Sequence, residues 1–187
     1  EQTTLERPAF LSKDGLTAAE MGTALHAFLE HADFSVLAAA KAAGGLEEAI
    51  LAERQRQVDR QLVAPEIAEK LDVSRIRRFV EGEAFAKICA ADEVLRELAF
   101  ITALPAEAVL AAQGTEGVRV EGEQVLVQGI ADLVLVYPDH LELLDYKTDR
   151  RKTEADFLRA YRAQLNLYAL AIDKRFAPKK VTYKGIC

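Results

Sequence analysis

The sequence has few cysteines: only Cys89 and Cys187 occur among its 187 residues. Two isolated cysteines cannot form the disulfide framework of a small secreted domain, and they cannot supply four thiolates to a metal centre. We therefore expect neither a cysteine zinc site nor an iron–sulfur cluster. Because structural disulfides are typical of oxidising compartments, their expected absence favours a reducing, cytoplasmic setting.

The sequence also lacks an apolar run of about 18 residues, the length that a membrane-spanning helix needs, so we expect no membrane partner. A G-x-x-x-x-G-K-[ST] motif is absent, so we expect no ATPase site of that type in this chain. There is no initiator methionine and no signal-peptide pattern, and we expect the sequence to be part of a longer protein. With 50% hydrophobic and 29% charged residues, the composition is that of an ordinary globular domain, which we predict spans 1–187.

Charge is unevenly distributed along the chain. Residues 147–187 carry eleven Lys or Arg against four acidic residues, a net charge of +7, although the whole chain carries −6. The remaining residues therefore carry −13. This asymmetry indicates a basic face on an acidic body, which suits a nucleic-acid partner, although a solvated basic helix would give the same pattern.

The first half of the chain, residues 1–92, is predicted to be mainly helical. Thr17 and Glu20 have the spacing of a capping box, and apolar residues then recur with helical periodicity, which predicts a helix from about 18 to 32. Further helices are expected before the glycine pair at 44–45, over 46–62, from Pro65 and within 74–91. This part forms a helical annex to the second half of the chain.

The second half, residues 93–187, is predicted to form a sheet with one long helix. Strands are expected at 93–105, 124–137, 141–147 and near the C-terminus, with a helix over 154–176 and a loop or meander over 106–123. Pro138 and Asp139 are turn residues, so the second and third strands form a hairpin. The predicted fold class is α/β, with a central mixed sheet flanked by helices.

The hairpin sets the position of two carboxylates. If residues 137–140 form the loop, Val136 pairs with Leu141, and Asp132 then lies opposite Asp145. Opposed residues have Cβ atoms about 4.5–5.5 Å apart, so two like charges there require a proton or a cation between them. Mg²⁺ or Mn²⁺ would neutralise the pair, because both prefer oxygen ligands. A one-residue bulge would break this register.

Lys147 follows Asp145 by two residues and projects to the same side of the strand. Two opposed carboxylates with a lysine on the same face suit metal-assisted phosphodiester hydrolysis, in which the ammonium stabilises developing negative charge. The alternative is a surface Asp–Lys pair at the end of a strand, because D-x-K is a common tripeptide.

Four ordered motifs resemble those of one nuclease family. "GIAD" at 129–132 followed by "LLDYKTD" at 143–149 resembles the PD-(D/E)xK motif in its RecB-like branch. Two further motifs of that branch are matched by Gly22 to His26 (G-x-x-x-H) and by Gln164 to Tyr168 (Q-x-x-x-Y). Ile130 and Ala131 stand where the motif name has proline. The segments around these motifs resemble the C-terminal nuclease domain of AddA-type ATP-dependent helicase/nuclease subunits.

The resemblance implies a restriction-endonuclease-like core and a role for each matched residue. Asp132 and Asp145 would be catalytic metal ligands and Lys147 the catalytic lysine. His26 and the backbone carbonyl of Tyr146 would be further metal ligands. Without the resemblance, His26 is more simply interpreted as a packing residue beside an apolar helix stripe.

The resemblance also implies accessory residues. Glu97 would lie near the site, although it is equally well interpreted as an exposed charge at a strand end. Gln164 and Tyr168 would lie beside the site, although Tyr161 and Tyr168 could instead form a core stripe. DNA contacts are expected from basic residues after the motif: Arg150, Arg151, Lys152, Arg159 and Arg162.

The function expected from this resemblance is a Mg²⁺-dependent DNA exonuclease domain that acts on single strands fed by a helicase motor, in double-strand break processing for recombinational repair. Its expected partners are the helicase portion of the same full-length chain and an AddB-type subunit, in the bacterial cytoplasm. The alternative is a non-catalytic DNA- or partner-binding module that retains the nuclease fold.

Overall fold

A computed structural model of the chain describes residues 17–115, 118, 120–147 and 154–187, without the side chains of residues 18 and 154–160. Helices and strands follow one another in this order: α1 (Ala18–His31), α2 (Phe34–Ala43), α3 (Leu46–Asp59), α4 (Pro65–Ala68), α5 (Val73–Glu81), α6 (Glu83–Ala90), β1 (Glu93–Pro105), α7 (Ala106–Ala112), β2 (Gln124–Val136), β3 (Leu141–Asp145), α8 (Glu154–Arg175) and β4 (Val181–Ile186). None of the helices in this described part is long and apolar enough to cross a membrane.

The helices of the N-terminal annex start and end where local sequence signals place them. Both hydrogen bonds of the capping box between Thr17 and Glu20 are present at the start of α1, which confirms that prediction. Asp33 caps α2, and Gly44 ends it with φ 82°, a left-handed conformation that glycine adopts without a Cβ clash. Pro65 occupies the first turn of α4, as expected.

The sheet has the strand order β1-β2-β3-β4. The β1–β2 and β2–β3 pairs are antiparallel, whereas the β3–β4 pair is parallel, so the predicted mixed sheet is confirmed. Val136 pairs with Leu141 and Leu133 with Leu144, which is the predicted hairpin register. A parallel pair needs a crossover connection, and α8 provides it.

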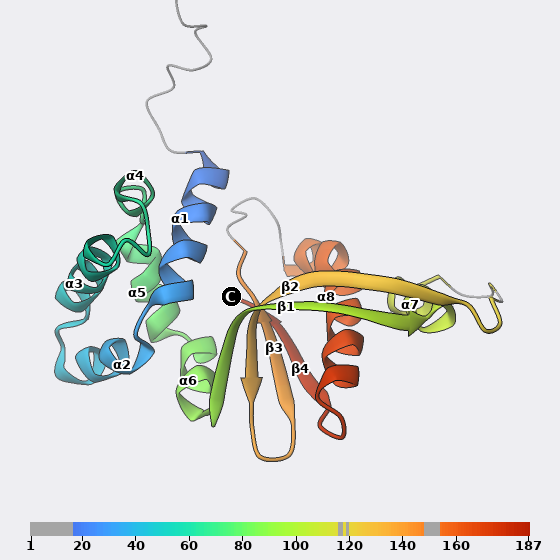
Figure 1. Cartoon of the computed structure of the whole chain (residues 1–187). Helices are drawn as coiled ribbons and strands as arrows, with labels where there is room; N and C mark the ends of the chain where they lie inside the picture. The colour runs from blue at the N-terminus through green and yellow to red at the C-terminus, as the bar shows by residue number, and fades with distance from the viewer. Residues whose placement is uncertain (1–16, 116–117, 119, 148–153) are drawn as a thin grey trace, which may run out of the picture.

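Two apolar clusters hold the sheet between helices. In one, α1–α3, α5 and α6 pack against Leu133, Leu135 and Leu144. In the other, α8 packs against Val134, Leu141 and Leu143. The annex thus covers one side of the sheet and α8 the other, while β1 and β2 continue as a long ribbon that ends near α7 (Figure 1). The strands converge beside α1, where the C-terminus also lies (Figure 1).

Arg96 ties the annex to the sheet. Its Nη1 donates hydrogen bonds to the carbonyls of Leu29 (3.3 Å), Glu30 (3.0 Å) and Ala32 (2.6 Å) at the end of α1. Its guanidinium also lies 3.9 Å from the centre of the Phe34 ring. These carbonyls would otherwise lack helical partners, so one side chain of β1 both caps α1 and positions it over the sheet.

Two predicted elements need correction. Residues 106–112, expected in a loop or meander, form α7, because Ala106 and Val109 are buried and the segment is rich in alanine, the strongest helix former. β3 ends at Asp145 rather than at residue 147. Tyr146 leaves the ladder because its N–H donates to a carboxylate oxygen of Asp132 (2.7 Å).

Candidate active site

Three carboxylates share one row across three strands. On both sides of Glu97 the register of β1 and β2 is constant, with Arg96 opposite Leu133 and Leu98 opposite Ala131, so Glu97 stands opposite Asp132. The β2–β3 register, carried one residue past the Leu133–Leu144 pair, brings Asp145 opposite Asp132 on the other side. The row therefore holds Glu97, Asp132 and Asp145.

The alternation of side chains breaks at this row. Ala131 belongs to the cluster on the α8 side, Leu133 to the annex side and Val134 again to the α8 side, so residues two apart face opposite ways. Glu97, across from the break, has φ 46°, a left-handed conformation that is strained for a residue with a side chain. Strain of this kind is concentrated at functional sites, and here it coincides with two carboxylates that meet α1.

His26 on α1 completes a cluster with the row. Its Nδ1 lies 3.9 Å from Glu97 Oε1 and 3.9 Å from Asp132 Oδ2. Its Nε2 lies 3.3 Å from the backbone carbonyl of Tyr146, and the edge of the Tyr146 ring meets the imidazole. His26 is thus part of a polar site and not only a packing residue beside an apolar stripe.

Lys147 lies on the other side of Asp145. Its Nζ is 2.5 Å from Asp145 Oδ2, and Asp145 is only 4% exposed. The ammonium lies 4.8 Å from the centre of the Tyr161 ring on α8, a cation–π contact that sequence analysis did not foresee. The backbone N–H of Lys147 donates to the carbonyl of Cys187 (3.1 Å), which fixes the segment after β3 beside β4.

The electrostatics of the site penalise negative charge. Burial raises the pKa of Asp132; the N–H of Tyr146 opposes this, and the charge of Asp145 adds to it. Burial also raises the pKa of Glu97, and the charge of Asp132 raises it further, while His26 lowers it. Both carboxylates would gain from a nearby cation, because a positive charge favours their ionised forms.

The residues present fit a divalent metal ion. One ligand atom each of His26, Glu97 and Asp132 lies within 4.8 Å of the other two. Asp145 Oδ2 is buried and forms no hydrogen bond with the described residues, although it contacts Lys147. Carboxylate and carbonyl oxygens are the donors that Mg²⁺ and Mn²⁺ prefer, and an imidazole is compatible with them.

A hollow of about 580 Å³ gives access to this cluster. Its lining comes from α1, β1, the segment after β3 and α8, and it includes Gly22, His26, Glu97, Lys147 and Tyr161. Gly22 and His26, the two defined positions of the G-x-x-x-H motif, both line the hollow. His26, Glu97 and Lys147 are therefore accessible from one side, whereas Asp132 and Asp145 do not line this hollow.

Gln164 and Tyr168 lie on α8 with half-buried side chains. The Tyr168 ring packs edge-on against Phe100, with 4.9 Å between ring centres. A Cβ on Gly129 would lie 2.8 Å from this ring, which explains why the "GIAD" segment begins with glycine. Tyr168 thus supports the sheet behind the row, as the core-stripe interpretation expected, whereas Tyr161 contacts Lys147.

The expected DNA-binding residues are only partly described. Arg150, Arg151 and Lys152 lie outside the described residues, as does the side chain of Arg159. Arg162 is exposed on α8, one residue after Tyr161. Of the five predicted DNA-binding side chains, only that of Arg162 is described, and it does not line the hollow.

Comparison with known proteins identifies the family of the chain. The family described as the PD-(D/E)XK nuclease superfamily matches residues 3–186, so the chain belongs to this superfamily. It is also similar to proteins that are named as the A-type subunit of an ATP-dependent helicase/nuclease. That of Moorella thermoacetica is 38% identical over 94% of the chain, and that of Heliobacterium modesticaldum is 36% identical over 97%. That of Geobacillus thermodenitrificans is 34% identical over 90%.

The chain spans 12–13% of the length of these curated relatives. Its matching part in each of them is therefore a small portion of a much longer protein. Membership in the superfamily and the names of these relatives support a DNA nuclease role for the chain.

Proposed function

We propose that the chain is a divalent-metal-dependent deoxyribonuclease domain that hydrolyses phosphodiester bonds in single-stranded DNA. The observation that carries this proposal is the row of three carboxylates, with His26 at one end and Lys147 at the other, in a member of a nuclease superfamily. A carboxylate (Glu97), an imidazole (His26) and the lysine (Lys147) line one hollow, together with Tyr146.

Asp132, Asp145, His26 and the carbonyl of Tyr146 would hold the metal, with Glu97 as a further carboxylate. Bound Mg²⁺, or Mn²⁺ in its place, would supply a Lewis acid for the scissile phosphate and acidify a water molecule. The N–H of Tyr146 holds the carboxylate of Asp132 in position before substrate binds.

Lys147 would act on the reacting phosphate directly. A protonated lysine donates hydrogen bonds but cannot bind a metal, so its role is to orient the attacking water or to stabilise the negative charge that develops. Asp145 and the face of Tyr161 hold the ammonium from two sides. The side chain of Lys147 is only 21% exposed, so these two contacts fix the position of its ammonium.

The basic residues after the motif would bind the phosphate backbone of the strand. We assign this role to Arg150, Arg151, Lys152, Arg159 and Arg162. The net charge of +7 over residues 147–187 and the exposure of Arg162 on α8 support it. Contacts of this kind position the strand without selecting its sequence.

In a full-length protein, we propose that the domain is an exonuclease which cuts single strands delivered by a helicase portion of the same chain. The names and lengths of the relatives support this. An AddB-type subunit would be its partner in processing double-strand breaks for recombinational repair in the bacterial cytoplasm.

The test is incubation of end-labelled single-stranded DNA with the protein in Mg²⁺ and in EDTA. We expect cleavage in Mg²⁺ alone, and none by Asp145→Ala in either buffer. Asp139→Ala is the matched control, because Asp139 lies in the hairpin loop with its side chain 85% exposed. DNA binding without cleavage by the parent protein in Mg²⁺ or Mn²⁺ would favour the non-catalytic binding module instead.

A further inference from the structure

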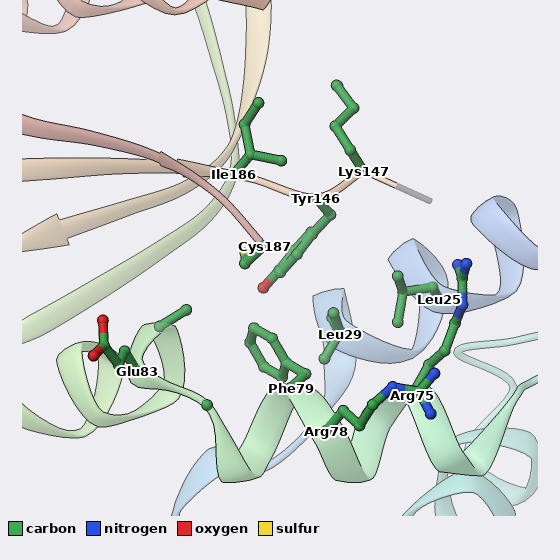
Figure 2. Close-up of a pocket in the computed structure, with 12 residues that line it drawn as sticks. Leu25, Leu29, Arg75, Arg78, Phe79, Glu83, Tyr146, Lys147, Ile186 and Cys187 are labelled. Carbon is green, nitrogen blue, oxygen red and sulfur yellow. The ribbon is translucent and has the colours of Figure 1, made fainter. Parts of the chain in front are cut away.

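A second hollow, of about 450 Å³, lies against the same Tyr146–Lys147 segment. It is lined by α1, by α5 and the start of α6, and by the ends of β3 and β4, so it adjoins the site on the annex side. Figure 2 shows the Tyr146 ring extending from its backbone toward Cys187 and Phe79, whereas Lys147 extends the opposite way. Two residues of the candidate active site therefore form part of its wall.

The wall of this annex-side hollow combines apolar and basic groups. Leu25, Leu29 and Phe79 supply an apolar surface, and Arg75 and Arg78 contribute guanidinium groups from α5 (Figure 2). These two arginines line the hollow against one acidic residue at the start of α6, and Arg75 also lies 4.0 Å from Asp72. The side chain of Lys147 extends away from the hollow, so only its stem contributes to the wall (Figure 2). Its volume lies within the range of about 300–1,000 Å³ that is usual for ligand sites.

Arg78 is exposed, and the one hydrogen bond described for it goes from Nη1 to Ser74 Oγ (3.2 Å). A guanidinium has five N–H donors, so Arg78 keeps donors for a phosphate. Its neighbour Arg77 differs, because it donates to Glu81 (3.0 Å) and does not line the hollow.

The hydroxyl of Tyr146 gives an independent indication of a ligand. Tyr146 is 3% exposed and lines the hollow, yet its hydroxyl has no hydrogen-bond partner among the described residues. Buried polar groups in proteins nearly always have a partner. A polar ligand atom, or a water molecule bound with the ligand, would supply one here.

We propose that the annex-side hollow binds the nucleotide next to the scissile phosphate, with its phosphate held by Arg75 and Arg78 and its base against Phe79. This inference rests on the proposed nuclease function and extends it, because it gives the strand a path over Tyr146 and Lys147 toward α5. Phosphate and ring-face contacts are common to all nucleotides, so this subsite tolerates any sequence.

The first experiment measures binding of a single-stranded oligonucleotide in Ca²⁺ at several salt concentrations. Arg78→Ala is expected to reduce the slope of log K against log[salt] by about 0.7, the value for one phosphate contact on a single strand. Arg78→Lys should restore most of the slope because it keeps the charge. Arg77→Ala is the matched control from the same helix and should leave the slope unchanged.

The second experiment places the fluorescent base 2-aminopurine at successive positions of the oligonucleotide. One position should show altered emission on binding to the parent protein, and Phe79→Leu should abolish this change. Phe79 also packs against Phe34, Phe85 and Tyr146, so the melting temperature of this variant is measured alongside. Arg78→Ala changes an exposed side chain and tests the subsite even if Phe79→Leu fails to fold.

The outcomes separate this inference from the proposed function. If the parent protein cleaves DNA but Arg78→Ala keeps the parent slope, the subsite does not exist and the nuclease function stands. An equal loss of slope in Arg77→Ala would mean that the slope reflects the general positive charge of the surface, and it would overturn the subsite. A lower melting temperature of Arg78→Ala with unchanged DNA binding would mean that Arg78 only stabilises the fold, and it would overturn the subsite. If the parent does not cleave DNA, the proposed function itself fails.

Discussion

Two regions of the molecule bury carboxylates in opposite ways. In the annex, Glu53 on α3 is 4% exposed and accepts hydrogen bonds from the N–H of Asp33 (3.0 Å), from Gln57 (3.3 Å) and from Arg56. Burial alone would raise the pKa of Glu53, but these hydrogen bonds outweigh burial and lower it. Its charge is therefore stabilised within the fold.

In the sheet, burial raises the pKa values of Asp132 and Glu97, and neighbouring carboxylates raise them further. The hydrogen bond from Tyr146 and the charge of His26 oppose this but do not reverse it. Burial is common to both regions, so the hydrogen-bond partners and neighbouring charges decide whether the pKa of a carboxylate is raised or lowered. A buried carboxylate with several hydrogen-bond donors, such as Glu53, stabilises the fold. A row of carboxylates with few donors is suited to bind a cation.

The largest expected effect comes from Asp132→Asn. The variant should lose metal affinity and at least about 1,000-fold in cleavage rate, because several kcal/mol of transition-state stabilisation depend on the metal. The amide oxygen can still accept the Tyr146 N–H, so the metal-free variant should be as stable as the parent or more stable. Calorimetric titration with Mg²⁺ and thermal melting in EDTA test both parts. Undiminished Mg²⁺ affinity would remove Asp132 from the metal site.

Lys147→Ala should separate catalysis from metal binding. We expect a loss of about 100- to 1,000-fold in cleavage rate, the usual effect of removing one group that stabilises transition-state charge. Mg²⁺ affinity should persist, because the carboxylates remain. Lys184→Ala is the control, since Lys184 lies on β4 and donates to Asn166 (2.7 Å) away from the site hollow. Activity within twofold of the parent would show that Lys147 has no catalytic role.

Glu53→Ala should reduce the stability of the fold but not cleavage, the opposite of what we expect for Asp132→Asn. Removing its oxygens leaves the donors of Asp33 and Gln57 without this partner, which should destabilise the fold by about 1–3 kcal/mol. Cleavage per folded molecule should stay near that of the parent. Denaturant unfolding and a cleavage assay at low temperature check both expectations. A stable variant with impaired cleavage would contradict the structural role of Glu53.

The smallest expected effect is a difference in pH dependence, measured by melting in EDTA. Because the folded pKa of Glu53 is lowered, its contribution is present above its unfolded pKa and lost as pH falls through a value below 4.5. Because the folded pKa of Asp132 is raised, its charge destabilises the fold at neutral pH. This penalty begins to shrink as pH falls through the folded pKa, above 3.8, and is lost below the unfolded pKa.

The two regions can therefore be distinguished by comparing variants across pH. Any stability advantage of Asp132→Asn over the parent should shrink as pH falls, while the disadvantage of Glu53→Gln should persist until the pH is below 4.5. Parallel curves for the two variants would show that the carboxylates do not differ as the structure indicates.

Much of the fold followed from short-range signals. The capping box at Thr17, the glycine after α2 and the Pro138–Asp139 turn act within a few residues, and all three predictions were confirmed. The hairpin register placed Asp132 opposite Asp145 for the same reason, because a short loop leaves few alternatives. The helix α7 was missed because its alanines are followed by three glycines, at 114, 117 and 122, which favour a loop.

The site could be predicted only in outline. Its motif residues were identified, but Glu97 was expected to be no more than an accessory, because its alignment with Asp132 depends on the long β1–β2 pairing. The break in alternation at this row was not foreseen, since a strict period of two was assumed for each strand. Tyr161 was assigned to a core stripe, and its contact with Lys147 depends on how α8 crosses the sheet.

By itself, the sequence determined the helix ends, the hairpin and the residue types of the site, because each depends on neighbours along the chain. Tertiary structure alone decided which of these residues meet. His26 and the Tyr146 carbonyl are 120 residues apart and come together because α1 packs on the sheet, where Arg96 holds its end. The annex-side hollow has the same origin, since its arginines and Tyr146 share no local signal. Burial of apolar surface does not depend on which residues are neighbours along the chain, so the sequence pattern alone does not show which elements pack together. Only the folded arrangement places these groups within reach of one another.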